Sequence, residues 1–379
     1  MHVAVPSESF DVERRVAATP DTVRKLIGLG AAVTVQRGAG TSAGIPDRDF
    51  ESAGATLGED FAGTVRDADL VLKVRRPTPE QVPLLKRGSA VVAIMDPYGQ
   101  DDALRGLAEA GVAAYAMELM PRITRAQVMD VLSSQANLAG YRAVIDAAEQ
   151  YGRAFPMMMT AAGTVPAARV FIMGVGVAGL QAIATARRLG AIVTATDVRP
   201  ATKEQVESLG AKFVAVEDEE FKQAETAGGY AKEMSEGYKR KQADLVASHI
   251  AKQDIVVTTA LIPGRPAPRL VSTAMVESMR PGSVVVDLAV ERGGNCELAR
   301  PGEVVDHNGV RIVGYLNVPG RLAATASSLY ARNLLAFVET LVDKERKVLA
   351  PNPDDELVKA TRLTHEGAVV HPSFQPKAA

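Results

Sequence analysis

Three glycines in the stretch "GVGVAG" have the spacing of a dinucleotide-binding turn. Gly174, Gly176 and Gly179 follow the apolar run 170–173 directly and open a helical segment. In such a turn the first glycine permits a tight bend, the second lets backbone amides approach a pyrophosphate, and the third lets the helix pack close to the strand. The start of the helix offers unpaired N–H groups and a partial positive charge to the phosphates. The spacing therefore predicts a dinucleotide site.

An acidic residue in the right place supports this prediction. The next apolar run, 191–197, ends on Asp197, which lies 18 residues after Gly179. A carboxylate there accepts hydrogen bonds from the adenosine ribose and repels a 2′-phosphate, so the sequence favours NAD(H) over NADP(H). Arg199 leaves an alternative open, because an arginine at this place can accommodate that phosphate. A glycine turn without any ligand is the structural alternative.

A second group of polar residues lies in "RITRAQVMDVLSSQANLAGYR". Gln127, Asp130, Ser134, Asn137 and Tyr141 follow one another at helical spacing and would share one face. A solvated helix face usually carries Lys and Glu, and a core face carries Leu and Val. The row therefore suggests a hydrogen-bonding role. Helix capping by Gln127 and a favourable dipole at Asp130 are the structural alternatives.

The same stretch predicts a long helix. Thr124 and Gln127 match the T-x-x-Q capping box, which places the helix start near Arg125, and an apolar stripe continues towards Gly152. A helix of that length spans about 40 Å, enough to bridge two domains.

Groups that could transfer a proton are scarce. A dehydrogenase that oxidises an alcohol or amine must move a proton as well as a hydride. We expect none of the five histidines at a strand end facing the nucleotide, and His249 on an exposed helix. Cys296 has no nearby histidine to form a thiolate. Lys73 is the one plausible amine, although a strand-end lysine reaching solvent fits equally well. Hydride exchange between two nicotinamides needs no such group, only rings held face to face.

Composition narrows the class of protein. With 379 residues, 47% of them hydrophobic, two domains are expected. A net charge of −2 and no long basic run argue against nucleic-acid binding. The single cysteine excludes an internal disulfide and a multi-cysteine metal site, and fits a reducing cytoplasm, so we expect no metal. The start does not look like a signal peptide, and charges and prolines interrupt the apolar stretch 154–186, so we expect no membrane insertion.

Apolar runs alternate with helical segments along the chain, which predicts an α/β fold of two Rossmann-like parallel-sheet domains joined by the long helix. The N-terminal domain would comprise 1–130 and 321–379, and the nucleotide-binding domain 131–320, with helix 327–345 returning to the first. The expected strands are 2–6, 31–35, 70–74, 90–94, 112–116, 169–173, 191–197, 211–216, 254–260, 283–289 and 310–315.

Local signals refine this picture. Thr19 as a cap and Pro20 at the first helical position predict a helix that ends at Gly28. The charged stretch 217–242 lacks a strand pattern and reads either as a functional mobile loop or as a tolerated insertion. The methionine-rich stretch 155–166 reads as a hairpin packed on a neighbouring subunit, with a cofactor lid as the alternative. The tail suggests a small hairpin at "THEGAVV".

With these residues in view, the chain resembles the NAD(H)-binding component of proton-translocating transhydrogenase. The match extends over nearly the whole chain and is most specific in "RITRAQVMDVLSSQANLAGYR", "GVGVAGLQAIATARRLGA", "ETAGGYAKEM", "TTALIPGRPAP" and "VVDLAVERGGNC". It implies hydride transfer from NADH to NADP⁺ held by a separate NADP(H)-binding component, coupled to proton movement through a membrane component. It also implies a cytoplasmic homodimer, peripheral to the inner membrane through its partner subunits.

The resemblance further implies the residues of the site. Arg122, Gln127 and Asp130, followed by Ser133 and Tyr141, would line the nicotinamide end, where the polar row would hold the carboxamide and ribose and orient the ring. The implied cofactor-binding positions are Gly174, Gly176, Val177, Ala178, Gly179, Asp197, Val198, Arg199, Gly229, Tyr230 (the loop tyrosine), Gln242 and Leu261.

Two other functions remain open. Alanine dehydrogenase shares this two-domain fold and uses a lysine that Lys73 matches, an arginine that Arg15 matches, and a histidine after the fourth strand. Here that region has Met95 and Asp96 and no histidine, and "PSES" departs from the family's usual lysine. A nucleotide-sensing regulator without chemistry is the third interpretation.

Overall fold

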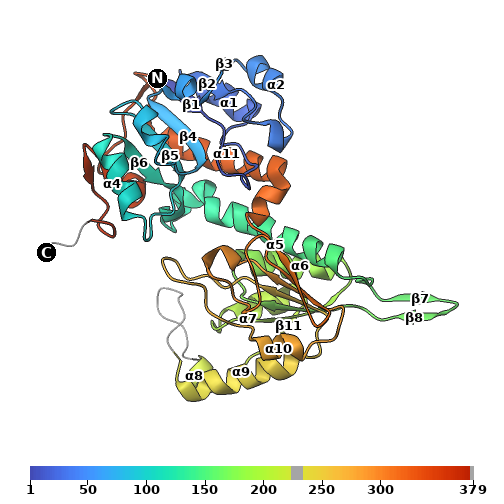
Figure 1. The fold of residues 1–379 in the computed structure, drawn as a ribbon. Helices are drawn as coiled ribbons and strands as arrows, with labels where there is room; N and C mark the ends of the chain where they lie inside the picture. The colour runs from blue at the N-terminus through green and yellow to red at the C-terminus, as the bar shows by residue number, and fades with distance from the viewer. Residues whose placement is uncertain (223–233, 376–379) are drawn as a thin grey trace. The chain divides into compact units, whose positions relative to one another are not determined.

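The computed structural model describes residues 1–222 and 234–375, and the chain divides into two units. Unit 1 consists of Met1–Gln135 and Pro319–Ala379, and unit 2 of Ala136–Val318 (Figure 1). Both contain a mostly parallel sheet flanked by helices, which confirms the predicted α/β class. No helix in the described residues is long and apolar enough to cross a membrane.

Unit 1 holds a six-stranded sheet in the order β3-β2-β1-β4-β5-β6, with every neighbouring pair parallel. This is the strand order of doubly wound nucleotide-binding folds. Five strands were predicted, and the three-residue β3 was missed because its run is too short to show a period. The strands are β1 (His2–Val5), β2 (Ala32–Gln36), β3 (Thr56–Gly58), β4 (Leu70–Arg75), β5 (Ala90–Ile94) and β6 (Ala113–Ala116).

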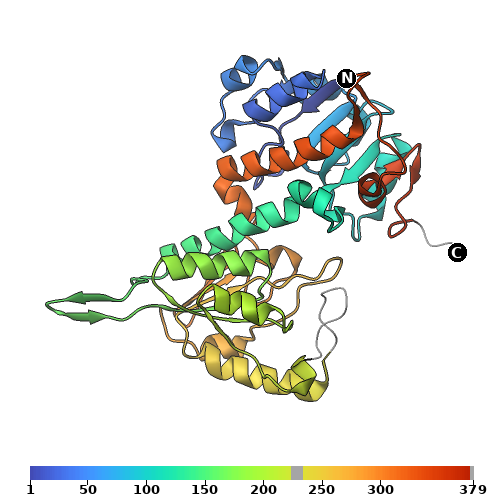
Figure 2. The same ribbon diagram turned by 180° about the vertical axis from the view of Figure 1, so that it is seen from behind.

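Helices cover both faces of this sheet. On β1, Val3 and Val5 join one core and Ala4 joins the other, so the strand is apolar throughout. The first core receives α1, α2, α11 and α12, and the second receives α3 and α4 (Figure 2). These helices are α1 (Pro20–Gly28), α2 (Asp47–Ser52), α3 (Phe61–Val65), α4 (Asp101–Glu109), α11 (Ala323–Leu341) and α12 (Glu356–Thr361).

Several local predictions for unit 1 are confirmed. Thr19 caps α1 by accepting a hydrogen bond from the Thr22 amide, and Pro20 occupies the first turn. The C-terminal segment returns to this unit as α11, and the small tail hairpin forms from β18 (Thr364–His365) and β19 (Ala368–Val369). The short helix α12 was not predicted.

Unit 2 holds a seven-stranded sheet in the order β11-β10-β9-β12-β13-β15-β14. All pairs are parallel except β14–β15, an edge hairpin that was not predicted and that turns at Asn308, with φ +53°, and Gly309. The strands are β9 (Arg169–Met173), β10 (Ile192–Thr196), β11 (Lys212–Phe213), β12 (Ile255–Thr258), β13 (Val284–Asp287), β14 (Val304–His307) and β15 (Val310–Val313). The helices around them are α6 (Val177–Arg188), α7 (Thr202–Ser208), α8 (Glu219–Lys222), α9 (Glu236–Ile250) and α10 (Thr273–Glu277).

The predicted start of the long helix was wrong. The α-helix, α5 (Val131–Gln150), begins six residues after Arg125, and Thr124–Met129 forms the 3₁₀ segment η4. The cap is Asp130, whose Oδ1 accepts a 2.9 Å hydrogen bond from the Ser133 amide. Aspartate is a strong N-cap, and tertiary contact also stops an earlier start, because the Val128 carbonyl accepts the Asn333 amide at 2.7 Å. The predicted polar row is therefore not one helix face.

The charged stretch 217–242 is also more regular than predicted at its ends. It contains the short α8, and α9 begins after Ser235, whose hydroxyl accepts a hydrogen bond from the Tyr238 amide. The central residues 223–233 lie outside the described residues.

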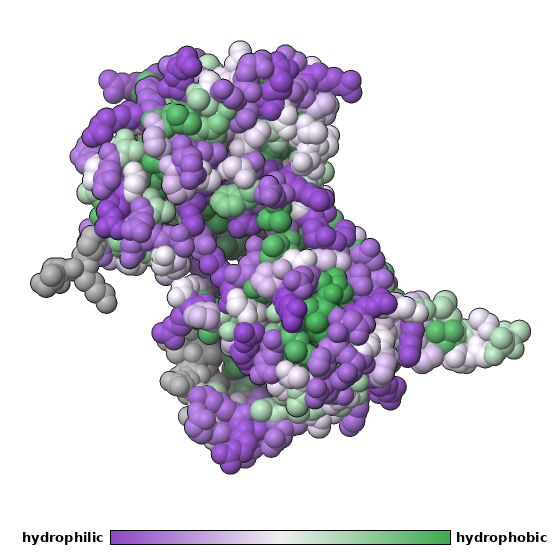
Figure 3. Space-filling view, viewed as in Figure 1, coloured by the Kyte–Doolittle hydropathy of each residue, from purple (hydrophilic) through white to green (hydrophobic). Residues whose placement is uncertain are grey.

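The methionine-rich segment forms the predicted hairpin, from β7 (Met158–Thr160) and β8 (Gly163–Val165), and extends from unit 2. Figure 3 shows apolar side chains on this hairpin, and the exposed fractions of Met157, Met158 and Met159 are 57%, 43% and 79%. An apolar surface of this kind is typical of an interaction site.

Candidate nucleotide-binding site

The glycine turn between β9 and α6 has the backbone that its sequence predicts. Gly174 has φ +100°, a conformation that favours glycine, and its carbonyl accepts a 3.0 Å hydrogen bond from the Thr259 hydroxyl. A Cβ on Gly179 would lie 1.9 Å from the Gly174 carbonyl oxygen. The first turn of α6 can therefore lie this close to the end of β9 only because residue 179 has no side chain.

Gly176 is different, because its missing side chain opens space outward. A Cβ built there meets no atom of the described structure within 4 Å. Among the described residues, no side chain caps the first turn of α6, which starts with Val177, Ala178 and Gly179. These amides lie at an open helix N-terminus, a place that binds phosphate groups. The turn therefore fits the pyrophosphate of a dinucleotide.

Asp197 stands directly after β10 and braces this turn. Its Oδ2 accepts a 2.7 Å hydrogen bond from the Val175 amide, and Oδ1 accepts one of 2.9 Å from the Arg199 amide. The Arg199 guanidinium also donates to both carboxylate oxygens, at 2.9 Å each. The guanidinium is thus held by a side chain of its own loop. This arrangement supports the function of Asp197 as the ribose-binding carboxylate and argues against Arg199 as a phosphate ligand.

Exposed apolar side chains surround the carboxyl ends of the central strands. Val177 follows β9, Val198 follows β10, and Leu261 follows β12, with exposed fractions of 38%, 52% and 54%. In a doubly wound sheet this edge carries the ligand site. Exposed apolar groups at that edge are suited to contact the flat faces of nucleotide rings.

Gln242, on α9, has a supporting contact in this structure. Its Oε1 accepts the Val216 amide at 2.9 Å, and its Nε2 donates to the Thr196 hydroxyl at 3.2 Å. The side chain therefore ties the end of β10 to the segment after β11. Gly229 and Tyr230, the other two residues expected near here, lie outside the described residues.

The residues expected to hold the nicotinamide fall on different elements. Arg122 and Gln127 are exposed around η4, and Asp130 and Ser133 hydrogen bond with each other at the start of α5. Tyr141 is 39% exposed on the portion of α5 that belongs to unit 2. Ser134, from the predicted polar row, donates to Asn333 at 2.8 Å, which is a packing contact within unit 1.

Two residues with acid–base potential are placed away from the proposed chemistry. His249 was predicted on an exposed helix, but it is half-buried, with Nε2 2.9 Å from the Thr194 hydroxyl in the middle of β10. Burial lowers the pKa of His249. Burial also raises the pKa of the Cys296 thiol to about 11, so this side chain remains a protonated thiol at neutral pH.

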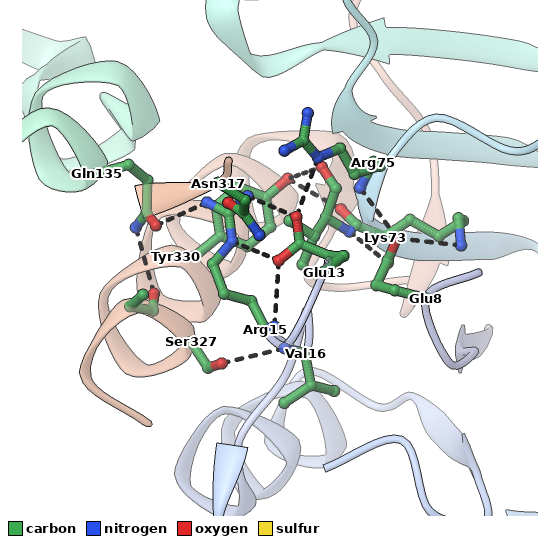
Figure 4. Close-up of polar contacts among 12 residues, drawn as sticks. Glu8, Glu13, Arg15, Val16, Lys73, Arg75, Gln135, Asn317, Ser327 and Tyr330 are labelled. Atoms are coloured by element: carbon green, nitrogen blue, oxygen red, sulfur yellow. Dashed lines mark hydrogen bonds and ion pairs between the residues drawn. The ribbon is translucent and has the colours of Figure 1, made fainter. Parts of the chain in front are cut away.

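Lys73 does not reach solvent, and that alternative was wrong. Its side chain is fully buried in unit 1, and its Nζ lies 3.4 Å from Oε2 of Glu8, the acidic residue of "PSES" (Figure 4). Glu8 also accepts the Val74 amide at 2.7 Å. Burial outweighs the attraction of Lys73 and raises the pKa of Glu8. The lysine is thus enclosed with a carboxyl group of the same chain.

Arg15 is enclosed in the same way. Its Nε and Nη2 donate to the two carboxylate oxygens of Glu13 at 2.7 Å each, and Nη1 donates to Gln135 at 2.8 Å (Figure 4). The exposed fraction of Arg15 is 4%. A carboxylate of the protein therefore occupies the fork with which an arginine would bind a substrate carboxylate. Neither glutamate was identified from the sequence, because their effect depends on pairing between separate segments.

Comparisons with known proteins agree with this architecture. The family described as "Alanine dehydrogenase/PNT, N-terminal domain" matches residues 4–139, and the corresponding C-terminal domain matches 143–372. The first of the separately named parts of NAD(P) transhydrogenase subunit alpha from Rhodospirillum rubrum is 55% identical over the full length of both chains. The solved structure of transhydrogenase from Sinorhizobium meliloti is 62% identical, covers 98% of this chain and 100% of its own, and superposes with a TM-score of 0.89. Alanine dehydrogenase of Halomonas elongata is 32% identical over 98% of this chain and 95% of its own.

The chain therefore belongs to the alanine dehydrogenase/PNT family, a class of two-domain proteins that bind nicotinamide nucleotides. Within that family, the similarity to transhydrogenase alpha subunits in sequence and structure supports a transhydrogenase role. The resemblance found in the sequence is confirmed at this level.

Proposed function

We propose that this chain is the NAD(H)-binding subunit of a proton-translocating transhydrogenase. NADH bound to it supplies hydride, which passes to NADP⁺ held by a separate NADP(H)-binding component. The observation that carries the proposal is the turn from Gly174 to Gly179, with its open helix N-terminus, braced by Asp197. The chain's similarity to transhydrogenase alpha subunits supports the same function.

In this proposal the protein binds and orients the dinucleotide and excludes water. The amides at the start of α6 hold the pyrophosphate, and Asp197 accepts the ribose hydroxyls. Arg122, Gln127 and Asp130 orient the carboxamide and ribose at the nicotinamide end, with Ser133 and Tyr141 nearby in sequence. No proton has to leave an alcohol or amine, so no general base is needed.

The paired charges in unit 1 favour this function over alanine dehydrogenase. Arg15 is bound by Glu13, and Lys73 is enclosed beside Glu8, so neither cation is available to an amino-acid substrate. The segment after β5 has Met95 and Asp96 in place of a histidine. Unit 1 therefore retains the fold of the rival enzyme while its cations are neutralised internally.

The partners follow from the proposed reaction. We propose a homodimer in which the apolar hairpin β7–β8 packs on the second subunit, since Met157, Met158 and Met159 are exposed in the monomer. The NADP(H)-binding component and a membrane proton-channel component would complete the enzyme. The chain would then be peripheral to the membrane through those partners.

A reconstitution assay tests the function. The protein is mixed with the NADP(H)-binding component of a related transhydrogenase, and reduction of a thionicotinamide analogue of NADP⁺ by NADH is followed. We expect turnover that needs both proteins and no NAD⁺ reduction when alanine is added to this chain alone. Alanine-dependent reduction would support the dehydrogenase alternative, and nucleotide binding without any transfer would support a sensor.

Nucleotide preference tests the role assigned to Asp197. Wild-type protein should bind NADH much more tightly than NADPH, because the carboxylate repels a 2′-phosphate. Asp197→Ser should weaken NADH binding about tenfold, the effect of losing a charged hydrogen bond, and should strengthen NADPH binding by releasing Arg199. Calorimetry measures both. Asp254→Ser is the matched control, because Asp254 accepts the Arg169 amide at 2.8 Å at the opposite edge of the sheet. Unchanged preference in Asp197→Ser would refute the assignment.

A further inference from the structure

The loop after β12 lies where the nicotinamide half of a bound dinucleotide belongs. In the sheet, β10 and β11 stand on one side of β9, and β12 and β13 stand on the other. A dinucleotide crosses such a sheet at this change of direction, with each half over one side. Asp197, after β10, marks the adenosine side. Leu261 and Ile262, which are 54% and 44% exposed after β12, therefore belong to the nicotinamide side.

One buried side chain holds both ends of this loop. The Oδ1 of Asn295 accepts the Ala260 amide at 3.0 Å, and its Nδ2 donates to the carbonyls of Ala260 and Pro268 at 2.9 and 2.8 Å. Asn295 has an exposed fraction of 0%. Its amide thus pairs with the backbone immediately before Leu261 and again eight residues further on.

Asn295 is itself fixed from behind. The neighbouring Cys296 amide donates to the buried carboxylate of Asp287 at 2.9 Å, at the end of β13. At the start of the loop, the Thr259 hydroxyl donates to the Gly174 carbonyl at 3.0 Å. The loop is therefore tied to β13 by Asn295 and to the pyrophosphate-binding turn by Thr259.

We propose that Asn295 is a positioning residue for the nicotinamide ring, acting through the backbone of Ala260 and the side chains of Leu261 and Ile262. This inference rests on the proposed function, since it assumes that the chain binds NADH. Asn295 touches only protein, and its effect is to set how the ring is presented for transfer. A small displacement of a reacting ring slows transfer strongly, whereas much of the binding contact is kept.

The test separates the two halves of the dinucleotide. Asn295→Ala should reduce the rate of hydride transfer at saturating NADH at least tenfold in the reconstituted system. Its affinity for NADH should fall only a few-fold, and its affinity for ADP, which contacts the adenosine side alone, should stay within twofold of wild type. Retained ADP binding shows that unit 2 remains folded.

Gln253→Ala is the matched control. Gln253 is a buried amide, 5% exposed, that donates to the His249 carbonyl at 3.1 Å and lies just before β12, at the other end of that strand. It should lower thermal stability without changing the transfer rate. Wild-type transfer by Asn295→Ala would overturn the proposal, as would ADP affinity that falls in step with NADH affinity. Failure of the wild-type protein to bind NADH would instead refute the proposed function.

Discussion

Gly179→Ala is expected to abolish measurable NADH binding, with a loss of at least 100-fold in affinity. The added Cβ would lie 1.9 Å from the Gly174 carbonyl oxygen and 2.9 Å from its carbonyl carbon. These are backbone atoms, so the clash cannot be relieved by a side-chain rotation. The start of α6 must move away from β9, and its amides then no longer point at the pyrophosphate. Calorimetric titration with NADH measures the effect.

Gly176→Ala separates space for the ligand from space within the fold. A Cβ there meets nothing within 4 Å, so thermal unfolding should stay at the wild-type temperature. NADH affinity should still fall, about tenfold or more, because the methyl group stands where the backbone approaches the phosphates. Gly152→Ala, also with nothing within 4 Å, is the control for both and should bind normally. Equal NADH affinity in all three variants would show that the dinucleotide does not bind at this turn.

These variants also show why the turn could be predicted from the sequence. A glycine spacing, an apolar strand and an acidic residue are local signals, and each has one physical reason. The strands and α1 were predictable on the same grounds, since period, capping residue and proline all lie within a few positions. The edge strand β14 and helix α12 are short and have weak periods, so they were missed.

The start of α5 shows where local reasoning fails. The T-x-x-Q pattern at Thr124 is a valid capping box in isolation. The outcome was decided by Asn333, which lies 205 residues away from Val128 in sequence and binds its carbonyl. No window around residue 124 contains that information. Asp130 was recognised as a site residue, and its capping of Ser133 was not.

The buried charges of unit 1 are the second case of this kind. Arg15 and Lys73 were identified by their resemblance to an enzyme that uses both. Their partners, Glu13 and Glu8, carry no motif, and only the fold shows that each cation faces an internal carboxyl group. The functional consequence is therefore a property of the tertiary structure.

Glu13→Gln is expected to destabilise unit 1 by about 3–5 kcal/mol, because it leaves the buried Arg15 guanidinium without its counter-charge. The side chains of Arg15 and Glu13 are 3% and 0% exposed. Glu59→Gln is the matched control, since Glu59 pairs with Arg37 at 2.9 Å but is 76% exposed, and its loss should leave the unfolding curve unchanged. Urea unfolding followed by circular dichroism measures both. The double variant Glu13→Gln with Arg15→Met should recover some of the stability. Equal curves for Glu13→Gln and Glu59→Gln would refute the role of the pair.

The same pair predicts how the stability of unit 1 depends on pH. Burial alone would raise the pKa of Glu13, but the guanidinium groups of Arg15 and Arg75 lower it from 4.5 to about 2. Because the folded-state pKa is the lower one, this stabilisation is fully present above pH 4.5 and is lost as the pH falls towards 2. At about 1.4 kcal/mol per pKa unit, the difference between 4.5 and about 2 corresponds to roughly 3 kcal/mol. Urea midpoints measured between pH 6 and pH 3 should therefore fall more steeply in the wild type than in Glu13→Gln, which has no carboxyl group to protonate at this position. Parallel slopes for the two proteins would mean that Glu13 titrates normally and that Arg15 does not depend on it.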